Sequence, residues 1–145
     1  MTRLSPLSSA GLACGIDVVD VESFARALRV SGSRMTRVCF TEQERHDAGD
    51  CADRLAARWA VKEAVAKALG VGLLQGVGLR EIETVVDEAG APRLVLHGGA
   101  RHLAQTRRLG MWAISVSHER GVAVAMAVAG RGDGPLLDDE EVSDG

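Results

Sequence analysis

The residues best suited to chemistry in this 145-residue chain are acids and lysines in two separate stretches. Asp17 lies in the apolar run LACGIDVV, where a buried carboxylate is costly unless it has a partner or a metal ion. Glu63 and Lys67 lie four residues apart in RLAARWAVKEAVAKALG, so on a helix they project from one face. Two carboxylates from separate elements, with a lysine nearby, suit a Mg²⁺ ion that also binds phosphate oxygens.

Lysine occurs only twice in the chain, at Lys62 and Lys67, and the other 15 basic residues are arginines. Because the two residue types are not equivalent at phosphate or catalytic sites, this exception suggests a specific use. The alternative is that Glu63 and Lys67 form an ordinary surface ion pair, worth a few tenths of a kcal/mol. Lys62 points about 100° away from Glu63 on a helix, and a helix-surface charge explains it equally well.

A second polar group, Ser115-Val-Ser117-His118, ends a run typical of a strand. Alternation puts the two serines on one face and the histidine on the other, so hydroxyls and an imidazole are offered at a sheet edge. The G-x-S-x-G elbow of hydrolases is absent from the sequence. The other histidines (His46, His97 and His102) lack metal-ligand spacing and are interpreted as surface or core residues.

A long helix over residues 54–70 is predicted to carry Glu63 and Lys67. This segment is rich in strong helix formers, lacks internal Gly and Pro, and ends at Gly70. Four of its residues recur at helical spacing and are expected to be buried. They are Leu55, Trp59, Ala66 and Leu69.

Periodicity and turn residues predict the remaining elements. A strand over 12–19 leads into a helix over 21–30, and either Asp17 or Asp20 can cap that helix. The capping-box sequence that starts at Thr41 opens a short helix. A Gly-rich loop is expected over 70–78. The later elements are expected at 80–86 (strand), 93–97 (strand), 99–109 (helix), 111–118 (strand) and 122–129 (strand).

These elements predict an α+β fold in one domain, with a mostly antiparallel sheet of three to five strands packed on the long helix. Residues 1–10 are expected to be a flexible leader, 11–129 the domain, and 130–145 a disordered acidic tail. The last 15 residues hold one Arg and six acids, whereas the preceding 130 carry 16 basic and 14 acidic groups. A mildly basic body is compatible with an anionic ligand or an acidic partner.

Composition also excludes several classes of function. Two Phe, two Trp and no Tyr argue against a stacking surface for nucleic acid. No apolar run reaches about 18 residues, so no membrane span is expected. Three cysteines without C-x-x-C spacing indicate reduced thiols and a cytoplasmic location.

Taken in order, the motifs resemble those of the small 4′-phosphopantetheinyl transferases, the holo-[acyl-carrier-protein] synthase family. The matching segments are GIDVV at 15–19, FTxxE at 40–44, RWAVKEAVAKALG at 58–70 and SVSH at 115–118. The resemblance covers roughly residues 11–129. It implies a Mg²⁺-dependent enzyme that moves 4′-phosphopantetheine from coenzyme A to a serine of an acyl carrier protein. Adenosine 3′,5′-bisphosphate is released.

The resemblance also implies roles for individual residues. Asp17 and Glu63 would hold Mg²⁺ on the coenzyme A pyrophosphate, and Lys67 would contact the phosphates. Glu63, directly or through a metal-bound water, would help to deprotonate the carrier serine. The catalytic residues implied are thus Glu63, Asp17 and Lys67. The other residues implied to bind coenzyme A are Arg58 at its 3′-phosphate, and Ser115, Ser117 and His118 along the pocket.

The family's short form is a homotrimer, so the implied partners are coenzyme A, an acyl carrier protein and two further copies. The first helix begins with Glu22 and Ser23, where the family usually has basic residues. Carriers of fatty-acid (lipid) synthesis and of polyketide synthesis therefore both remain open, as do acyl-coenzyme A tolerance and the choice of Mg²⁺ or Mn²⁺. The alternative function is a non-catalytic coenzyme A- or carrier-binding module. A Mg²⁺-dependent phosphohydrolase would need a further acidic cluster or a nucleophile.

Overall fold

The computed structural model describes residues 11–132, so the expected leader and most of the expected tail lie outside the described residues. Within 11–132, none of the helices combines the length and apolar character needed to cross a bilayer. The elements are β1 (Leu12–Asp20), α1 (Val21–Ser31), α2 (Ser33–Cys39), α3 (Glu42–Ala48), α4 (Ala52–Leu69), the 3₁₀ turn η1 (Leu79–Glu81), β2 (Ile82–Val86), β3 (Pro92–Leu96), α5 (Gly98–Thr106), β4 (Leu109–Glu119) and β5 (Val122–Arg131).

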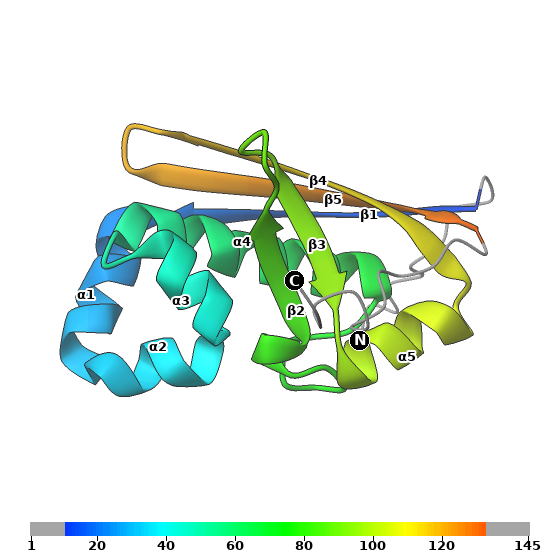
Figure 1. The fold of residues 1–145 in the computed structure, drawn as a ribbon, viewed down its shortest axis with the longest axis horizontal. Helices are drawn as coiled ribbons and strands as arrows, with labels where there is room; N and C mark the ends of the chain where they lie inside the picture. Colours follow the sequence, from blue (N-terminus) through cyan, green and yellow to red (C-terminus); the bar gives the residue numbers. More distant parts are fainter. Residues whose placement is uncertain (1–10, 133–145) are drawn as a thin grey trace.

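The strands form two antiparallel sheets rather than one. The larger sheet has the order β1-β5-β4, and β2 and β3 make a separate hairpin. In Figure 1 the helices lie on one side of the larger sheet, and the hairpin crosses α4 at a steep angle to β4. β3 pairs with β2 and is not part of the β1-β5-β4 ladder. The α+β class and the central helix are confirmed.

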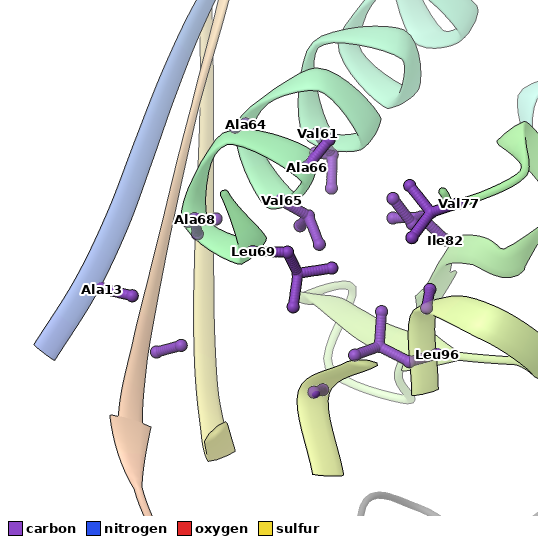
Figure 2. Packing of buried hydrophobic residues seen from close by; sticks show 14 of the residues in the cluster. Ala13, Val61, Ala64, Val65, Ala66, Ala68, Leu69, Val77, Ile82 and Leu96 are labelled. Carbon is purple, nitrogen blue, oxygen red and sulfur yellow. The ribbon is translucent and has the colours of Figure 1, made fainter. Parts of the chain in front are cut away.

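Small side chains let α4 lie close to the larger sheet. The inner face of β5 is a row of fully buried alanines: Ala123, Ala125, Ala127 and Ala129. On β1, a Cβ added at Gly15 would lie 1.9 Å from the carbonyl oxygen of Ala64. The opposite side of α4 carries larger residues, and Figure 2 shows Val65 and Leu69 projecting toward Val77, Ile82 and Leu96. The long helix is therefore buried between the sheet and the hairpin.

Local signals predicted most helix ends correctly. Asp20 caps α1 by accepting from Ser23 N at 2.7 Å, which leaves Asp17 available for another role. Thr41 and Glu44 form the expected capping box of α3. Gly70 ends α4 in the left-handed conformation.

Several elements differ from the prediction. α5 ends at Thr106, before the expected end at 109, and β4 begins at Leu109 rather than at 111. The arginine-rich segment after the first helix forms a short helix, α2, that was not predicted. Residues 79–81 form η1, so β2 begins two residues later than expected. β5 continues to Arg131, past the expected end of the domain at residue 129, because its pairing with β4 and β1 extends to Gly130 and Arg131.

Candidate active site

Asp17 and Lys67, far apart in sequence, meet where β1 crosses the C-terminal half of α4. Lys67 Nζ lies 3.2 Å from Asp17 Oδ1 and donates to the carbonyl oxygen of Ile16 at 2.8 Å. The side chain of Asp17 is 18% exposed and that of Lys67 is 46% exposed. Lys67 therefore pairs with β1, which favours a role in the site over an ordinary pairing along the helix. Its half-exposed ammonium keeps a third N–H for a ligand.

Glu63 completes this group from one turn earlier on α4. It is half-buried, and its burial, followed by the negative charge of Asp17, raises the pKa of its carboxyl group. Lys67 acts in the opposite direction and lowers that pKa. A carboxylate that lies beside a second negative charge gains from binding a cation.

An open hollow of about 510 Å³ lies over the two carboxylates. Its lining includes the capping residues Asp20 and Ser23 at the start of α1, and the aromatic rings of Phe24 and Trp59. The ring centroids of Phe24 and Trp59 are 6.2 Å apart. The sequence predicts no ligand role for Asp20, Ser23, Phe24 or Trp59, because cap and core positions are explained by folding alone.

The interpretation of Lys62 as a helix-surface charge is wrong. Its side chain is fully buried and pairs with Glu44 at 2.7 Å. The cause is the β2–β3 hairpin and α3, which cover a face of α4 that would be exposed in a helix packed on a sheet alone. The capping-box acid Glu44 was the one available signal, since it is also a potential partner for a buried lysine.

Arg58 lies apart from the carboxylates. It is five residues before Glu63, which is roughly 140° around the helix. The side chain is 8% exposed and donates from Nη1 to the carbonyl oxygen of Arg54 at 3.1 Å. Its buried Nε has no partner among residues 11–132. Burial lowers the pKa of this guanidinium, while Glu44 and Asp47 raise it.

A second hollow, of about 130 Å³, lies beside Arg58 between α4, the hairpin and β4. Its other lining residues are Ala57, Val61, Thr84, Val86, Gly90, Pro92 and Val116. The hydroxyl of Thr84 is buried and, like Nε of Arg58, has no partner within the described part of the chain. Two orphaned polar atoms in one small hollow indicate an incomplete hydrogen-bonding site.

The polar end of β4 follows the expected alternation. Ser115 pairs with Met126 and Ser117 with Val124, on the sheet face that points away from α4. Val116, on the inner face, lines the Arg58 hollow, and His118 follows it two residues later and is exposed.

Apart from Arg58, which lines the second hollow, the predicted site residues thus form two groups in one chain. Asp17, Glu63 and Lys67 lie at the β1 edge, whereas Ser115–His118 belong to β4 at the opposite edge of the β1-β5-β4 sheet. Asp17 is in register with Ala125 on β5, which in turn is in register with Val116 on β4. With strands about 4.8 Å apart and β5 between them, the two edge strands are separated by about 10 Å.

Comparison with known proteins gives a consistent result. Residues 13–127 match the model of the 4′-phosphopantetheinyl transferase superfamily. The holo-[acyl-carrier-protein] synthase of Herpetosiphon aurantiacus is 41% identical over 124 residues, covering 81% of this chain and 97% of the relative. That of Salinispora arenicola is 43% identical over 123 residues, covering 83% and 98%.

The fold is also similar to that of solved structures. The ACPS–CoA complex of Chronobacterium ammoniagenes superposes with a TM-score of 0.70 at 31% identity, covering 83% of this chain and 98% of the other. Sequence motifs, fold and full-length relatives agree. The chain belongs to the 4′-phosphopantetheinyl transferase superfamily, within its holo-[acyl-carrier-protein] synthase family.

Proposed function

We propose that this chain transfers 4′-phosphopantetheine from coenzyme A to a carrier serine at the Asp17–Glu63 pair, with the aid of Mg²⁺. The observation that carries this proposal is the convergence of Asp17, Glu63 and Lys67 beside one open hollow. Each comes from a motif of the family, and together they offer two acceptor carboxylates and one cation. Phosphoryl transfer depends mainly on such positioning and charge neutralisation.

The residues at this site fit Mg²⁺ better than a metal held by protein alone. Among residues 11–132, no three His, Cys, Asp or Glu side chains gather closely enough to hold a metal ion. Mg²⁺ commonly uses one or two carboxylates together with substrate phosphates and water. Asp17 and Glu63 would supply the carboxylates, and the coenzyme A pyrophosphate would complete the shell. The bound ion would neutralise charge on that pyrophosphate.

The protein side chains divide the remaining work. Lys67 can direct its free N–H to a phosphate oxygen while its contacts to β1 hold it in place. Glu63 accepts the proton of the carrier serine while the serine oxygen attacks the phosphorus that bears pantetheine. The pyrophosphate bond then breaks, and adenosine 3′,5′-bisphosphate leaves. In the metal-free chain, burial and the charge of Asp17 raise the pKa of Glu63, which supports a proton-accepting role for it.

We assign the 3′-phosphate of coenzyme A to Arg58, and its buried, unpartnered Nε supports this. Replacing Arg58 by Met, which keeps the bulk of the stem, should raise KM for coenzyme A by about 10- to 100-fold, the worth of a charged hydrogen bond. Steady-state kinetics with 3′-dephospho-coenzyme A provides the control. Its KM should not change, and an equal rise for both substrates would contradict the assignment.

A homotrimer would explain why the site residues form two groups. In the proposed assembly, Asp17, Glu63 and Lys67 of one copy line one coenzyme A site together with residues 115–118 of a neighbouring copy. The outer face of the larger sheet supports contact between copies because it carries exposed apolar side chains on all three strands. They are Leu12, Ile16, Val18, Met111, Val122 and Met126, between 36% and 62% exposed.

Met126 lies at the middle of this face, in register with Ile16 and Ser115. Replacing it by Glu should convert the trimer into monomers, because each copy would bury a carboxylate at the contact. Light scattering after size-exclusion chromatography measures the change, and transfer activity should fall with it. The control is Val30→Glu on α1, which is 84% exposed and should leave the mass unchanged. A wild-type chain that is already monomeric would contradict the trimer.

The arginine-rich surface of α1 and α2 is the proposed docking site for an acidic carrier. Arg26, Arg29, Arg34 and Arg37 are exposed there. Arg26 Nη2 lies 3.6 Å from Glu22, which offsets part of the positive charge at the start of α1. The start of α1 is therefore less positive than is usual in the family. Both fatty-acid and polyketide carriers remain candidates. The free thiols among the described residues suit a reducing cytoplasm.

The direct test is intact-mass spectrometry of apo carriers incubated with the protein, coenzyme A and Mg²⁺. A gain of one phosphopantetheine that is lost on chelation would establish the reaction and its metal. A panel of fatty-acid and polyketide carriers would identify the preferred class by rate. Binding of coenzyme A without modification of any carrier would instead favour a binding module.

A further inference from the structure

Lys62 carries a fully buried ammonium that the proposed reaction does not use. Its Nζ donates to Glu44 Oε1 at 2.7 Å, to the carbonyl oxygen of Leu79 at 2.9 Å and to the carbonyl oxygen of Ile82. These three acceptors use all three N–H groups of the ammonium. The Phe40 ring centroid lies 5.4 Å from the same nitrogen. Lys62 is thus fixed in a complete set of contacts.

Glu44 extends this set of contacts to two further backbone groups. Its Oε1 accepts from the amide of Thr41 at 3.1 Å, and its Oε2 accepts from the amide of Thr84 at 3.3 Å. The side chain is 0% exposed. The Lys62–Glu44 pair therefore joins four elements: α3, α4, η1 and β2.

Stability alone is a weak explanation for such a pair. Burial lowers the pKa of Lys62, and Glu44 offsets this only in part by raising it. Apolar residues of similar volume are often as good as, or better than, a buried ion pair. The pair also fixes the position of α4, because its directional hydrogen bonds to backbone atoms of neighbouring elements restrict how the helix can rotate or slide. Lys62 immediately precedes Glu63, so the restriction falls on the turn that carries the proposed base.

Lys67 holds the same part of α4 from another side, through Ile16 and Asp17 on β1. The two lysines of the chain thus tether successive turns of one helix, Lys62 to η1 and β2, and Lys67 to β1. We infer that Lys62 and Glu44 are positioning residues, which fix the α4 turn bearing Glu63 against Asp17. This inference rests on the proposed function. The ammonium of Lys62 makes its hydrogen bonds to Glu44, Leu79 and Ile82, so it acts on Glu63 through the position of the helix.

The test removes the tether while keeping the core electrically neutral. In the double variant Lys62→Met/Glu44→Gln, Met retains the stem, and Gln still suits the capping box. Mn²⁺ is titrated, in the presence of saturating coenzyme A, into wild type, the double variant and Glu63→Gln. Free Mn²⁺ is measured by electron paramagnetic resonance, and a titration of coenzyme A without protein is subtracted. We expect about 10-fold weaker Mn²⁺ binding by the double variant, in the range typical of residues that orient metal ligands. We expect a similar fall in kcat, with KM for coenzyme A and carrier unchanged.

A matched control separates positioning from stability. Leu96→Val lowers stability through the same core, because Leu96 is 4% exposed on β3, yet it should leave Mn²⁺ binding and kcat unchanged. If the double variant fails to fold, Glu44→Asp replaces it. That variant keeps both charges, shortens the carboxylate arm by one methylene, and should also weaken Mn²⁺ binding.

The outcomes separate the positioning role of the Lys62–Glu44 pair from the metal site of the proposed function. Mn²⁺ binding and kcat within twofold of wild type, in a folded variant of the pair, would show that the pair is only structural and overturn the inference. Equal Mn²⁺ binding by wild type and Glu63→Gln would refute the metal site on which the inference rests.

Discussion

Replacing Glu63 by Gln is expected to lower kcat by at least about 100-fold, the usual contribution of a general base, while the protein becomes more stable at neutral pH. Burial and the charge of Asp17 raise the pKa of Glu63 above the ordinary value of 4.5. The ionised carboxylate therefore opposes folding, and glutamine removes this opposition without changing the shape of the side chain. The proposed reaction therefore requires an ionised Glu63 at a position where the ionised form destabilises the folded chain.

The sign of the pH dependence follows from the raised pKa. Below pH 4.5 the carboxyl group is protonated in both the folded and the unfolded chain, so wild type and Glu63→Gln should be about equally stable. As pH rises through the folded pKa, wild type loses stability relative to the variant. Thermal melts in EDTA from pH 4 to pH 8 measure the difference.

A matched control for this pH series is Glu88→Gln, which changes an exposed carboxylate in the β2–β3 turn. It should leave both melting temperature and kcat unchanged. A Glu63→Gln variant with near-normal turnover would refute the role of Glu63 as base. A variant that is less stable than wild type at pH 7 would refute the electrostatic conflict.

The site residues that could be predicted from sequence are those fixed by local order. Helical spacing puts Glu63 and Lys67 on one side of α4, and Gly70 ends the helix where expected. Asp17 could be assigned because an acid inside an apolar strand is costly unless it has a partner, and Lys67 is that partner.

Lys62 could not be predicted because its acceptors are distant in sequence. Glu44, Leu79 and Ile82 lie 17 to 20 residues away, and they meet Lys62 only after the hairpin folds onto α4. The separation of the strands into two sheets has the same origin, since alternation identifies strands but not the angle at which a hairpin crosses a helix. The grouping of the site residues depends on strand order, which places β5 between β1 and β4.

Gly15→Ala is expected to have the second large effect, because it acts on the contact that brings Asp17 to Glu63. The new Cβ would lie 1.9 Å from the carbonyl oxygen of Ala64, 2.9 Å from its carbonyl carbon and 3.0 Å from the amide nitrogen of Ala68. All three are backbone atoms of α4, so a side-chain rotation cannot relieve the clash. β1 must move away from the helix, and we expect a loss of about 1–3 kcal/mol in the free energy of unfolding.

The same displacement should reduce kcat far more than the loss of stability explains. Asp17 lies two residues beyond Gly15 on the same face of β1, so a strand moved by about 1 Å carries its carboxylate away from Glu63, at a cost near 100-fold. Thermal melts and kcat measured well below the melting temperature separate the two effects. Gly130→Ala on β5 is the control, since its Cβ would meet Met111 at an ordinary 3.6 Å. A folded Gly15→Ala variant with normal kcat would show that the Asp17–Glu63 arrangement does not depend on this close approach. Adding Ala64→Gly should not rescue the variant, because the clash is with the backbone of residue 64 and not with its side chain.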